Sequence, residues 1–393
     1  MQDLNQRSLP SHSQNEFLSP KAVPDISAWQ LFPGTYVVGN SELDRYVVVP
    51  APKLSILTEA ISYFDGFQTI KSITTRFSRK GQAVDVLTLY QRLLKAGLLA
   101  DSEPRGELSR LALPLFDMEI GPAFNACQSA VQVLFLPLLL LTVVTVATGF
   151  FLLLEHHSAI EAELFQAGHS WSVWGCTLFG LAMTLSLLAH ELAHGFTATW
   201  LGLRPRQFAA VAYLAVMPIF FLKIPGIYTL SPGQRVQVWI SGVWINLTIA
   251  STALIATQIV TMPVLYEQVL TGLAVSNGFI VAWNLVPFLP TDGYFIMCTL
   301  LKKPNIRPRA WQEFSRWIRL RVKPSPMLLL YFGLSLLTTL GALLLNATWA
   351  YRVATHSVAG FVFGCLLILS VLLGLVHLVK SLIATRKPEG EGI

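Results

Sequence analysis

Long apolar runs separated by short polar connections fill most of the chain after residue 128. A run of about 20 apolar residues is long enough to cross a bilayer as a helix. Six runs meet this condition: Val131–Leu154, Val173–Leu201, Val236–Met262, Leu270–Leu289, Met327–Leu345 and Val358–Val379. The pattern therefore predicts a membrane α-helical bundle of about six transmembrane helices over residues 128–382, followed by a polar C-terminal tail over residues 383–393.

A seventh apolar run, Phe208–Ile224, does not suit a spanning helix because it is short, contains Pro218 and is interrupted by Lys223. We expect it to form a re-entrant or extended segment. Irregular backbone at membrane depth must be covered by protein, since its polar groups find no water there. The segment is therefore predicted to pack against the helices.

The part of the chain before the first apolar run follows a different pattern. Residues 1–28 are polar and contain Ser, Pro and Asn, which predicts a disordered N-terminal segment. Residues 29–105 show two short strand patterns and three helical patterns, at Gly34–Val38, Arg45–Val49, Leu54–Tyr63, Thr69–Phe77 and Val84–Ala96. We therefore expect a small α+β domain here.

Composition supports a membrane protein. The chain is 53% hydrophobic and 13% charged, whereas soluble domains are about 25% charged. The four cysteines, Cys127, Cys176, Cys298 and Cys365, have no C-x-x-C spacing, so packing is the expected role rather than metal binding or disulfides. The N-terminus does not resemble a signal peptide, so the N-terminal region is expected to stay in the cytoplasm.

The distribution of basic residues predicts the orientation of the helices. No Lys or Arg lies between Arg110 and Arg204. Eight lie between the fourth and fifth runs: Lys302, Lys303, Arg307, Arg309, Arg316, Arg319, Arg321 and Lys323. Because basic residues mark the cytoplasmic side, both termini are predicted to be cytoplasmic in a multi-pass protein of the cell membrane. Aromatic residues interleave with this cluster, so an interfacial amphipathic helix at anionic headgroups is expected rather than a nucleic-acid site.

The apolar run Val173–Leu201 contains the motif His190-Glu191-Leu-Ala-His194. Ionisable residues at membrane depth cost roughly 2.5–3.5 kcal/mol each on insertion scales, so they are functional by default. On a helix the two histidines lie one turn apart on one face, a spacing that lets both bind one zinc ion. Glu191 could then take a proton from a metal-bound water. A chance H-E-x-x-H string is the alternative, and it is rarer in an apolar helix.

A catalytic zinc site has three protein ligands and an open position. The next ionisable residue at membrane depth is Asp292, at the end of the fourth run, in the sequence NLVPFLPTDG. Pro287 and Pro290 are expected to break the helix there, and Gly293 frees the backbone, so the carboxylate can turn inward. An Asp at the end of a span is more often a cap residue, but the upstream motif favours a third ligand.

These two motifs closely resemble the paired signatures of the site-2 proteases, the intramembrane zinc metalloproteases, over roughly residues 170–300. The resemblance implies one Zn²⁺ per chain held by His190, His194 and Asp292, with Glu191 as the general base. It implies that Asn284 positions substrate. A related small-Gly-Pro-x-x-Asn stretch matches Ser241–Asn246 except that Val243 replaces the Pro, which weakens the assignment of Asn246 to the substrate. A helix–helix hydrogen bond is an equally open role for both asparagines.

The N-terminal domain resembles PqqD-like winged-helix domains, which bind the leader peptides of ribosomally made peptides. Winged helices also bind DNA, but the basic residues of this domain are spread out, which argues against nucleic acid. A peptide-binding domain fused to an intramembrane protease resembles the peptide zinc metalloproteases encoded with bacterial peptide-maturation or export systems. The resemblance thus implies a bacterial protein with export or maturation proteins as partners.

Two classes of function follow from the sequence. The first is an intramembrane zinc metalloendopeptidase that hydrolyses a peptide precursor or a membrane protein by means of zinc-activated water. The second is a non-catalytic membrane component of peptide maturation or export, in which the metal site is structural or lost. The first is favoured because a non-catalytic protein has no need to keep Glu191.

Overall fold

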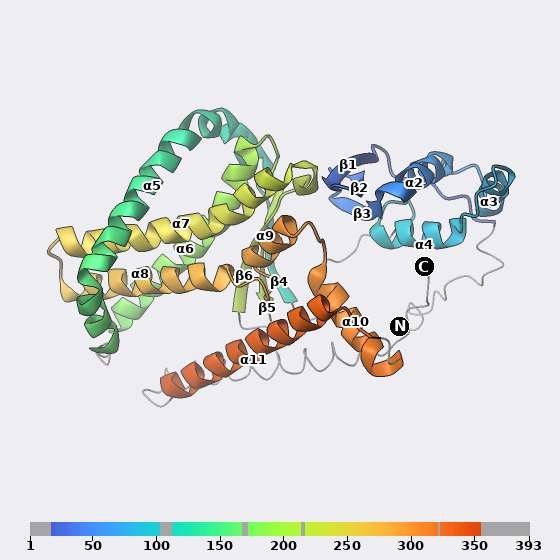
Figure 1. Ribbon diagram of the computed structural model, residues 1–393. Coiled ribbons are helices and arrows are strands. Elements are labelled where there is room, and N and C mark those ends of the chain that lie inside the picture. Colours follow the sequence, from blue (N-terminus) through green and yellow to red (C-terminus); the bar gives the residue numbers. More distant parts are fainter. Residues whose placement is uncertain (1–16, 103–111, 167–171, 214–216, 321–322, 355–393) are drawn as a thin grey trace, which may run out of the picture. The chain divides into compact units, whose positions relative to one another are not determined.

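The computed structural model describes residues 17–102, 112–166, 172–213, 217–320 and 323–354 (Figure 1). The chain forms two compact units. The first contains the described N-terminal residues, 17–102, together with the loop Pro225–Ser231. The second contains the described residues from 112 to 224 and from 232 to 354, and it includes every residue of the H-E-x-x-H motif.

The N-terminal unit is an antiparallel sheet followed by three helices. The strands β1 (Ser27–Phe32), β2 (Thr35–Asn40) and β3 (Arg45–Pro50) pair in that order. They are followed by α2 (Ala51–Tyr63), α3 (Ile70–Arg79) and α4 (Val86–Ala96). The two strands and three helices expected from the sequence are confirmed, and β1 is an additional strand that the sequence analysis does not predict. The resemblance of the N-terminal unit to PqqD-like winged-helix domains stays a prediction.

The expected disorder of the N-terminal segment is wrong for residues 17–28. The Ala22 amide donates to the Phe64 carbonyl at 2.8 Å, and the Val23 amide donates to the Leu98 carbonyl at 3.0 Å. Apolar side chains in this segment, including Leu18 and Ile26, pack against the buried core of the unit. A few well-placed apolar residues therefore anchor a stretch whose overall composition is polar.

Four helices of the second unit are long and apolar enough to cross a membrane. They belong to α5 (Gly121–Gln166), α6 (Val173–Trp200), α7 (Pro232–Ile259) and α8 (Val264–Asn284). The first four predicted runs are thus confirmed as helices. The fifth lies in α11 (Pro326–Ala354), of which Pro326–Gly341 forms a shorter apolar stretch. The sixth, Val358–Val379, lies outside the described residues, so the count of six stays a prediction.

The C-terminal ends of α5 and α8 differ from those predicted. Helix α5 continues to Gln166, so the acidic stretch after Leu154 is helical rather than a loop. Helix α8 ends at Asn284 rather than at Leu289. The second difference follows from Pro287, because a proline disfavours helical backbone at the residue before it and removes an amide donor.

The seventh apolar run forms two strands, β5 (Gln207–Tyr213) and β6 (Met217–Lys223), which confirms its extended character. They join β4 (Ala112–Glu119), which the sequence did not predict, in an antiparallel sheet of order β4-β5-β6. The register places Phe208 opposite Leu222. Leu222 packs against the same buried cluster as Leu188 and Leu192 of α6, so the sheet lies against the helix that contains the H-E-x-x-H motif.

The remaining helices are α9 (Asp292–Leu300) and α10 (Ile306–Leu320), which pack with α11 around Tyr294, Ile306 and Phe332. Helices α6, α7 and α8 lie side by side (Figure 1). Helix α5 exposes a continuous apolar surface, which includes Val133, Leu134, Leu136, Leu138, Leu140, Leu141 and Val144. So large an apolar surface is unfavourable in water but suits contact with lipid.

Candidate metal centre

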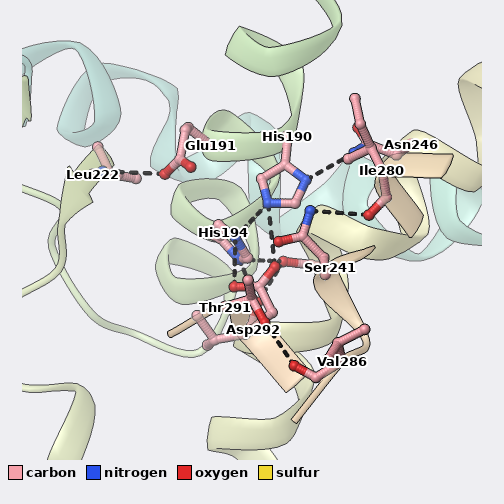
Figure 2. Close-up of polar contacts among 12 residues, drawn as sticks. His190, Glu191, His194, Leu222, Ser241, Asn246, Ile280, Val286, Thr291 and Asp292 are labelled. Carbon is pink, nitrogen blue, oxygen red and sulfur yellow. Dashed lines mark hydrogen bonds and ion pairs between the residues drawn. The ribbon is translucent and has the colours of Figure 1, made fainter. Parts of the chain in front are cut away.

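Helix α6 places His190 and His194 on the same face, one turn apart (Figure 2). The helix begins after Ser172, whose hydroxyl accepts a hydrogen bond from the Gly175 amide at 3.0 Å. Both histidines are buried, and their Nε2 atoms are 3.3 Å apart. The two ring nitrogens therefore converge on one point inside the protein.

Asp292 faces the two histidines from the start of α9. Its Oδ2 lies 3.2 Å from His190 Nε2, and its Oδ1 lies 3.5 Å from His194 Nε2. Asp292 Oδ2 is buried and has no hydrogen-bond partner in the part of the chain that the structure describes. A buried carboxylate oxygen without a donor is costly unless a cation neutralises it.

Helix α11 holds the loop that leads to Asp292. The Tyr331 hydroxyl donates to the Pro287 carbonyl at 3.2 Å, and the Ser335 hydroxyl donates to the Phe288 carbonyl at 2.9 Å. Within the loop, the Thr291 hydroxyl donates to the Val286 carbonyl at 3.0 Å. These bonds satisfy carbonyls that the broken helix leaves unpaired, and they fix the direction in which α9 begins.

The three side chains fit a tetrahedral metal ion. The ligand atoms of a zinc site lie about 2.0–2.2 Å from the ion, so neighbouring ligand atoms are about 3.3–3.6 Å apart. The two Nε2 atoms are 3.3 Å apart, and the Asp292 carboxylate approaches them with different oxygens, Oδ2 at 3.2 Å from His190 and Oδ1 at 3.5 Å from His194. The set of two imidazoles and one carboxylate is also one that zinc accepts.

His194 is oriented by the backbone of α7. Its Nδ1 lies 2.7 Å from the Val238 carbonyl oxygen, which can only accept a hydrogen bond. Nδ1 therefore bears the hydrogen, and the lone pair of Nε2 points toward His190 and Asp292. The sequence does not predict this contact, because every residue has a backbone carbonyl and the side chain of Val238 does not show that its carbonyl meets a histidine.

His190 contacts Asn246 of α7. The amide nitrogen of Asn246 lies 3.1 Å from His190 Nδ1, and Oδ1 of the same amide is buried with no partner among the described residues. The oxygen and nitrogen of an amide are interchangeable in such an assignment. Turning the oxygen toward the ring lets it accept a hydrogen bond from Nδ1 and leaves Nε2 of His190 free for a metal. This hydrogen bond joins α6 and α7, and it links Asn246 to His190, which is a predicted zinc ligand.

Glu191 points away from the histidine pair toward β6 (Figure 2). Its Oε2 accepts a hydrogen bond from the Leu222 amide at 3.2 Å. One carboxylate oxygen of Glu191 nevertheless lies within 4.8 Å of a ring nitrogen of each histidine. The carboxylate is thus close enough to exchange a proton with a water molecule bound at the centre.

The hydrogen bond that the structure gives Asn284 stays within α8 and does not involve the candidate metal centre, so its predicted role in positioning substrate stays a prediction. Its amide nitrogen donates to the Ile280 carbonyl at 3.1 Å, one turn earlier in α8. The nearby Gly293 allows a close approach, since a β-carbon there would lie 2.5 Å from the Leu285 carbonyl oxygen. This glycine lets α9 start directly beside the end of α8, which places Asp292 at the centre.

No protein-family profile matches the chain, and no solved structure matches it. A similarity was found to a Bacillus subtilis (strain 168) protein named "Putative peptide zinc metalloprotease protein YydH", with 23% identity over 149 residues. The name of that relative describes a zinc metalloprotease. The match spans 37% of this chain and 56% of the length of that relative. It agrees with a metal site built around His190, Glu191 and His194.

Proposed function

We propose that the chain is an intramembrane zinc metalloendopeptidase of the site-2 protease type. Its substrate is a membrane-associated protein or peptide precursor. The observation that supports this most strongly is the convergence of three side chains: the Nε2 atoms of His190 and His194 are 3.3 Å apart, and each faces one carboxylate oxygen of Asp292, Oδ2 at 3.2 Å and Oδ1 at 3.5 Å respectively. These residues would hold one zinc ion per chain and leave a fourth position open.

Glu191 is the proposed general base. Bound zinc would polarise the scissile carbonyl and make a water molecule more acidic. Glu191 takes the proton from the attacking water and then delivers a proton to the leaving amine. The Glu191 carboxylate lies beside both histidines, whereas the Asp292 carboxylate directs one oxygen at each of them. This difference favours Asp292 as the ligand and Glu191 as the base.

The site is proposed to lie within a bacterial cell membrane. Its histidines belong to a helix that is long and apolar enough to span a bilayer. Helix α5 offers an apolar surface to lipid. Six spans with both termini in the cytoplasm would place the basic segment from Lys302 to Lys323 on the cytoplasmic side.

Two features suit an extended peptide substrate. Strand β6 lies at an edge of its sheet and next to α6, so an unwound substrate can add to it as a further strand. The N-terminal unit contains a second antiparallel sheet with three helices, and we propose that it binds a peptide in the manner of PqqD-like domains. The proposed partners are thus a peptide precursor and the proteins that mature or export it.

A comparison of membrane peptidomes tests this function. Cells that express wild-type protein are compared with cells that express Glu191→Gln, which keeps the shape of the side chain but removes the base. Cleavage is expected to fall by orders of magnitude while the zinc content stays unchanged. Glu267→Gln, the same substitution in the first turn of α8, is the matched control and should cleave normally.

A second variant tests the ligand set. Asp292→Ala should lower the zinc content of the purified protein as well as cleavage. Full cleavage by Glu191→Gln would overturn the proposed enzymatic function. It would favour the alternative, in which the protein is a non-catalytic component of peptide maturation or export. In that case removal of residues 29–105 should abolish the export phenotype, whereas the Glu191→Gln substitution should leave it intact.

A further inference from the structure

The ends of two side chains, from Leu222 of β6 and Phe124 of α5, pack directly over Gly195 of α6. A β-carbon at this glycine would lie 2.6 Å from Leu222 Cδ2 and 2.6 Å from Phe124 Cζ. Carbon atoms in contact are normally about 3.5–4.0 Å apart. A larger residue here would push the ends of these two side chains away from the turn of α6 that follows Glu191 and contains His194.

The register of the sheet directs the Leu222 amide away from β5. The Lys223 carbonyl accepts a hydrogen bond from the Arg206 amide at 3.0 Å, so Lys223 faces β5. Neighbouring residues of a strand direct their backbone groups to opposite edges. Leu222 therefore faces outward, and its amide meets Glu191 Oε2 at 3.2 Å.

We propose that the Leu222 amide is a positioning group for Glu191. This inference rests on the proposed function, in which Glu191 is the base. A free glutamate side chain has several rotamers, and only some of them keep the carboxylate within reach of the two histidines. A hydrogen bond to one carboxylate oxygen selects such a rotamer, and it leaves the other oxygen available for the proton of a water molecule.

The same contact determines how a substrate strand can pair with β6. The outward-facing residues of this strand are Pro218, Phe220 and Leu222, by alternation. Pro218 has no amide hydrogen, and the Leu222 amide is engaged by Glu191. The Phe220 amide is therefore the donor that this stretch offers to an added peptide. The carbonyls of Pro218, Phe220 and Leu222 point to the same edge as acceptors, so a paired substrate would extend as far as the residue whose amide contacts Glu191.

Two substitutions at one position separate the amide from the side chain. Leu222→Pro removes the donor, and an outward-facing proline is compatible with an edge strand, as Pro218 already shows. Leu222→Ala is the matched control, which keeps the donor and removes most of the side chain. Both are assayed with a fluorogenic peptide that spans a site cleaved by the wild-type protein and spared by Glu191→Gln.

Relative to Leu222→Ala, the Leu222→Pro variant should lower kcat roughly 10- to 100-fold, the equivalent of one hydrogen bond to a charged group. KM and zinc content should change little, whereas a merely structural defect would affect both variants alike. Equal kcat values for the two variants would overturn the proposal.

Amide hydrogen exchange tests the contact without any catalytic readout. In the full-length protein the Leu222 amide should exchange faster in Glu191→Ala than in wild type. It should stay slow in Glu191→Gln, whose side-chain oxygen still accepts the hydrogen bond. The Phe220 amide, on the same edge, should not respond. Equal exchange at Leu222 in all three proteins would overturn the proposal. If the wild-type protein cleaved nothing, the proposed function would fail while the exchange result still stood.

Discussion

The backbone of α7 comes so close to His190 at Gly242 that a β-carbon there would lie 2.6 Å from His190 Nε2. The same β-carbon would lie 2.6 Å from His194 Nε2. Both distances are far shorter than a normal contact between a carbon and a ring nitrogen. Helix α7 thus closes one side of the candidate centre with its backbone, and a glycine is required at this position.

Replacing Gly242 with alanine should therefore displace the two imidazoles. We expect the purified Gly242→Ala protein to contain much less zinc than wild type, as measured by atomic emission. Gly278→Ala is the matched control, because nothing lies within 4 Å of a β-carbon at Gly278 in α8. Its zinc content should equal that of wild type. Normal zinc in Gly242→Ala would contradict the placement of this glycine against the ligands.

The orientation of the membrane helices gives a second prediction. A reporter inserted after Lys323 or fused at Ile393 should be cytoplasmic, and one inserted near Ala162 should lie on the opposite side. The reason is the absence of Lys and Arg between Arg110 and Arg204 and their concentration after the fourth span. Labelling of the three sites from both sides of intact cells provides the measurement. The reverse pattern would place the opening of the site on the wrong side.

The parts of the fold that the sequence predicts are those with a strong local signal. Helices α6 and α7 follow from runs of apolar residues, and the extended run after Phe208 follows from its short length and Pro218. The H-E-x-x-H motif places two histidines on one face whatever surrounds them. Asp292 is distant in sequence, and its prediction rests on its place as the next ionisable residue at membrane depth, on the helix-breaking Pro287 and Pro290, and on the resemblance of this stretch to a known signature.

The contacts that sequence reasoning missed involve backbone groups and distant partners. The Val238 carbonyl orients His194, and the Leu222 amide holds Glu191, but neither contact depends on the side chain of that residue. Strand β4 was missed because it acquires its partner, β5, only through tertiary pairing. The partner of Asn246 could not be chosen either, since a polar residue in a span is compatible with many neighbours.

The N-terminal unit offers a prediction on stability. Asp85 caps α4, since its carboxylate accepts hydrogen bonds from the Thr88 amide at 2.9 Å and the Thr88 hydroxyl at 2.6 Å. Asp85→Ala should destabilise this helix by about 1 kcal/mol, and Asp85→Ser should restore most of the loss. Faster amide exchange in α4 of the full-length protein is the measurement. Unchanged exchange would show that the cap is dispensable.

The stabilisation by Asp85 also depends on pH. The hydrogen bonds from Thr88 lower the pKa of Asp85 below its usual value. The contribution is therefore fully present above the unfolded pKa of about 3.9, and it is lost as the pH falls through the folded value. The difference in α4 exchange between wild type and Asp85→Ala should accordingly shrink under strongly acidic conditions. A constant difference across that range would rule out the charged carboxylate as its source.

Two asparagines provide a matched test of the candidate metal centre. Asn246 and Asn277 are both fully buried within the second unit. Asn246 contacts His190, whereas Asn277 accepts a hydrogen bond from the Ser186 hydroxyl and donates to the Leu273 carbonyl. Asn246→Ala should weaken zinc binding by about 10- to 100-fold, the usual effect of losing a partner that orients a ligand.

Asn277→Ala should lower the stability of the helix bundle without weakening zinc binding. Asn246→Asp should bind zinc about as tightly as wild type, because its carboxylate still accepts the hydrogen bond from His190 Nδ1. Competition with a chelating dye measures the affinity of each purified variant, and thermal unfolding in detergent measures stability. An equal loss of zinc affinity in Asn246→Ala and Asn277→Ala would mean that burial, rather than the contact with His190, explains the effect. Retention of full affinity in Asn246→Ala would show that His190 needs no partner to bind the metal.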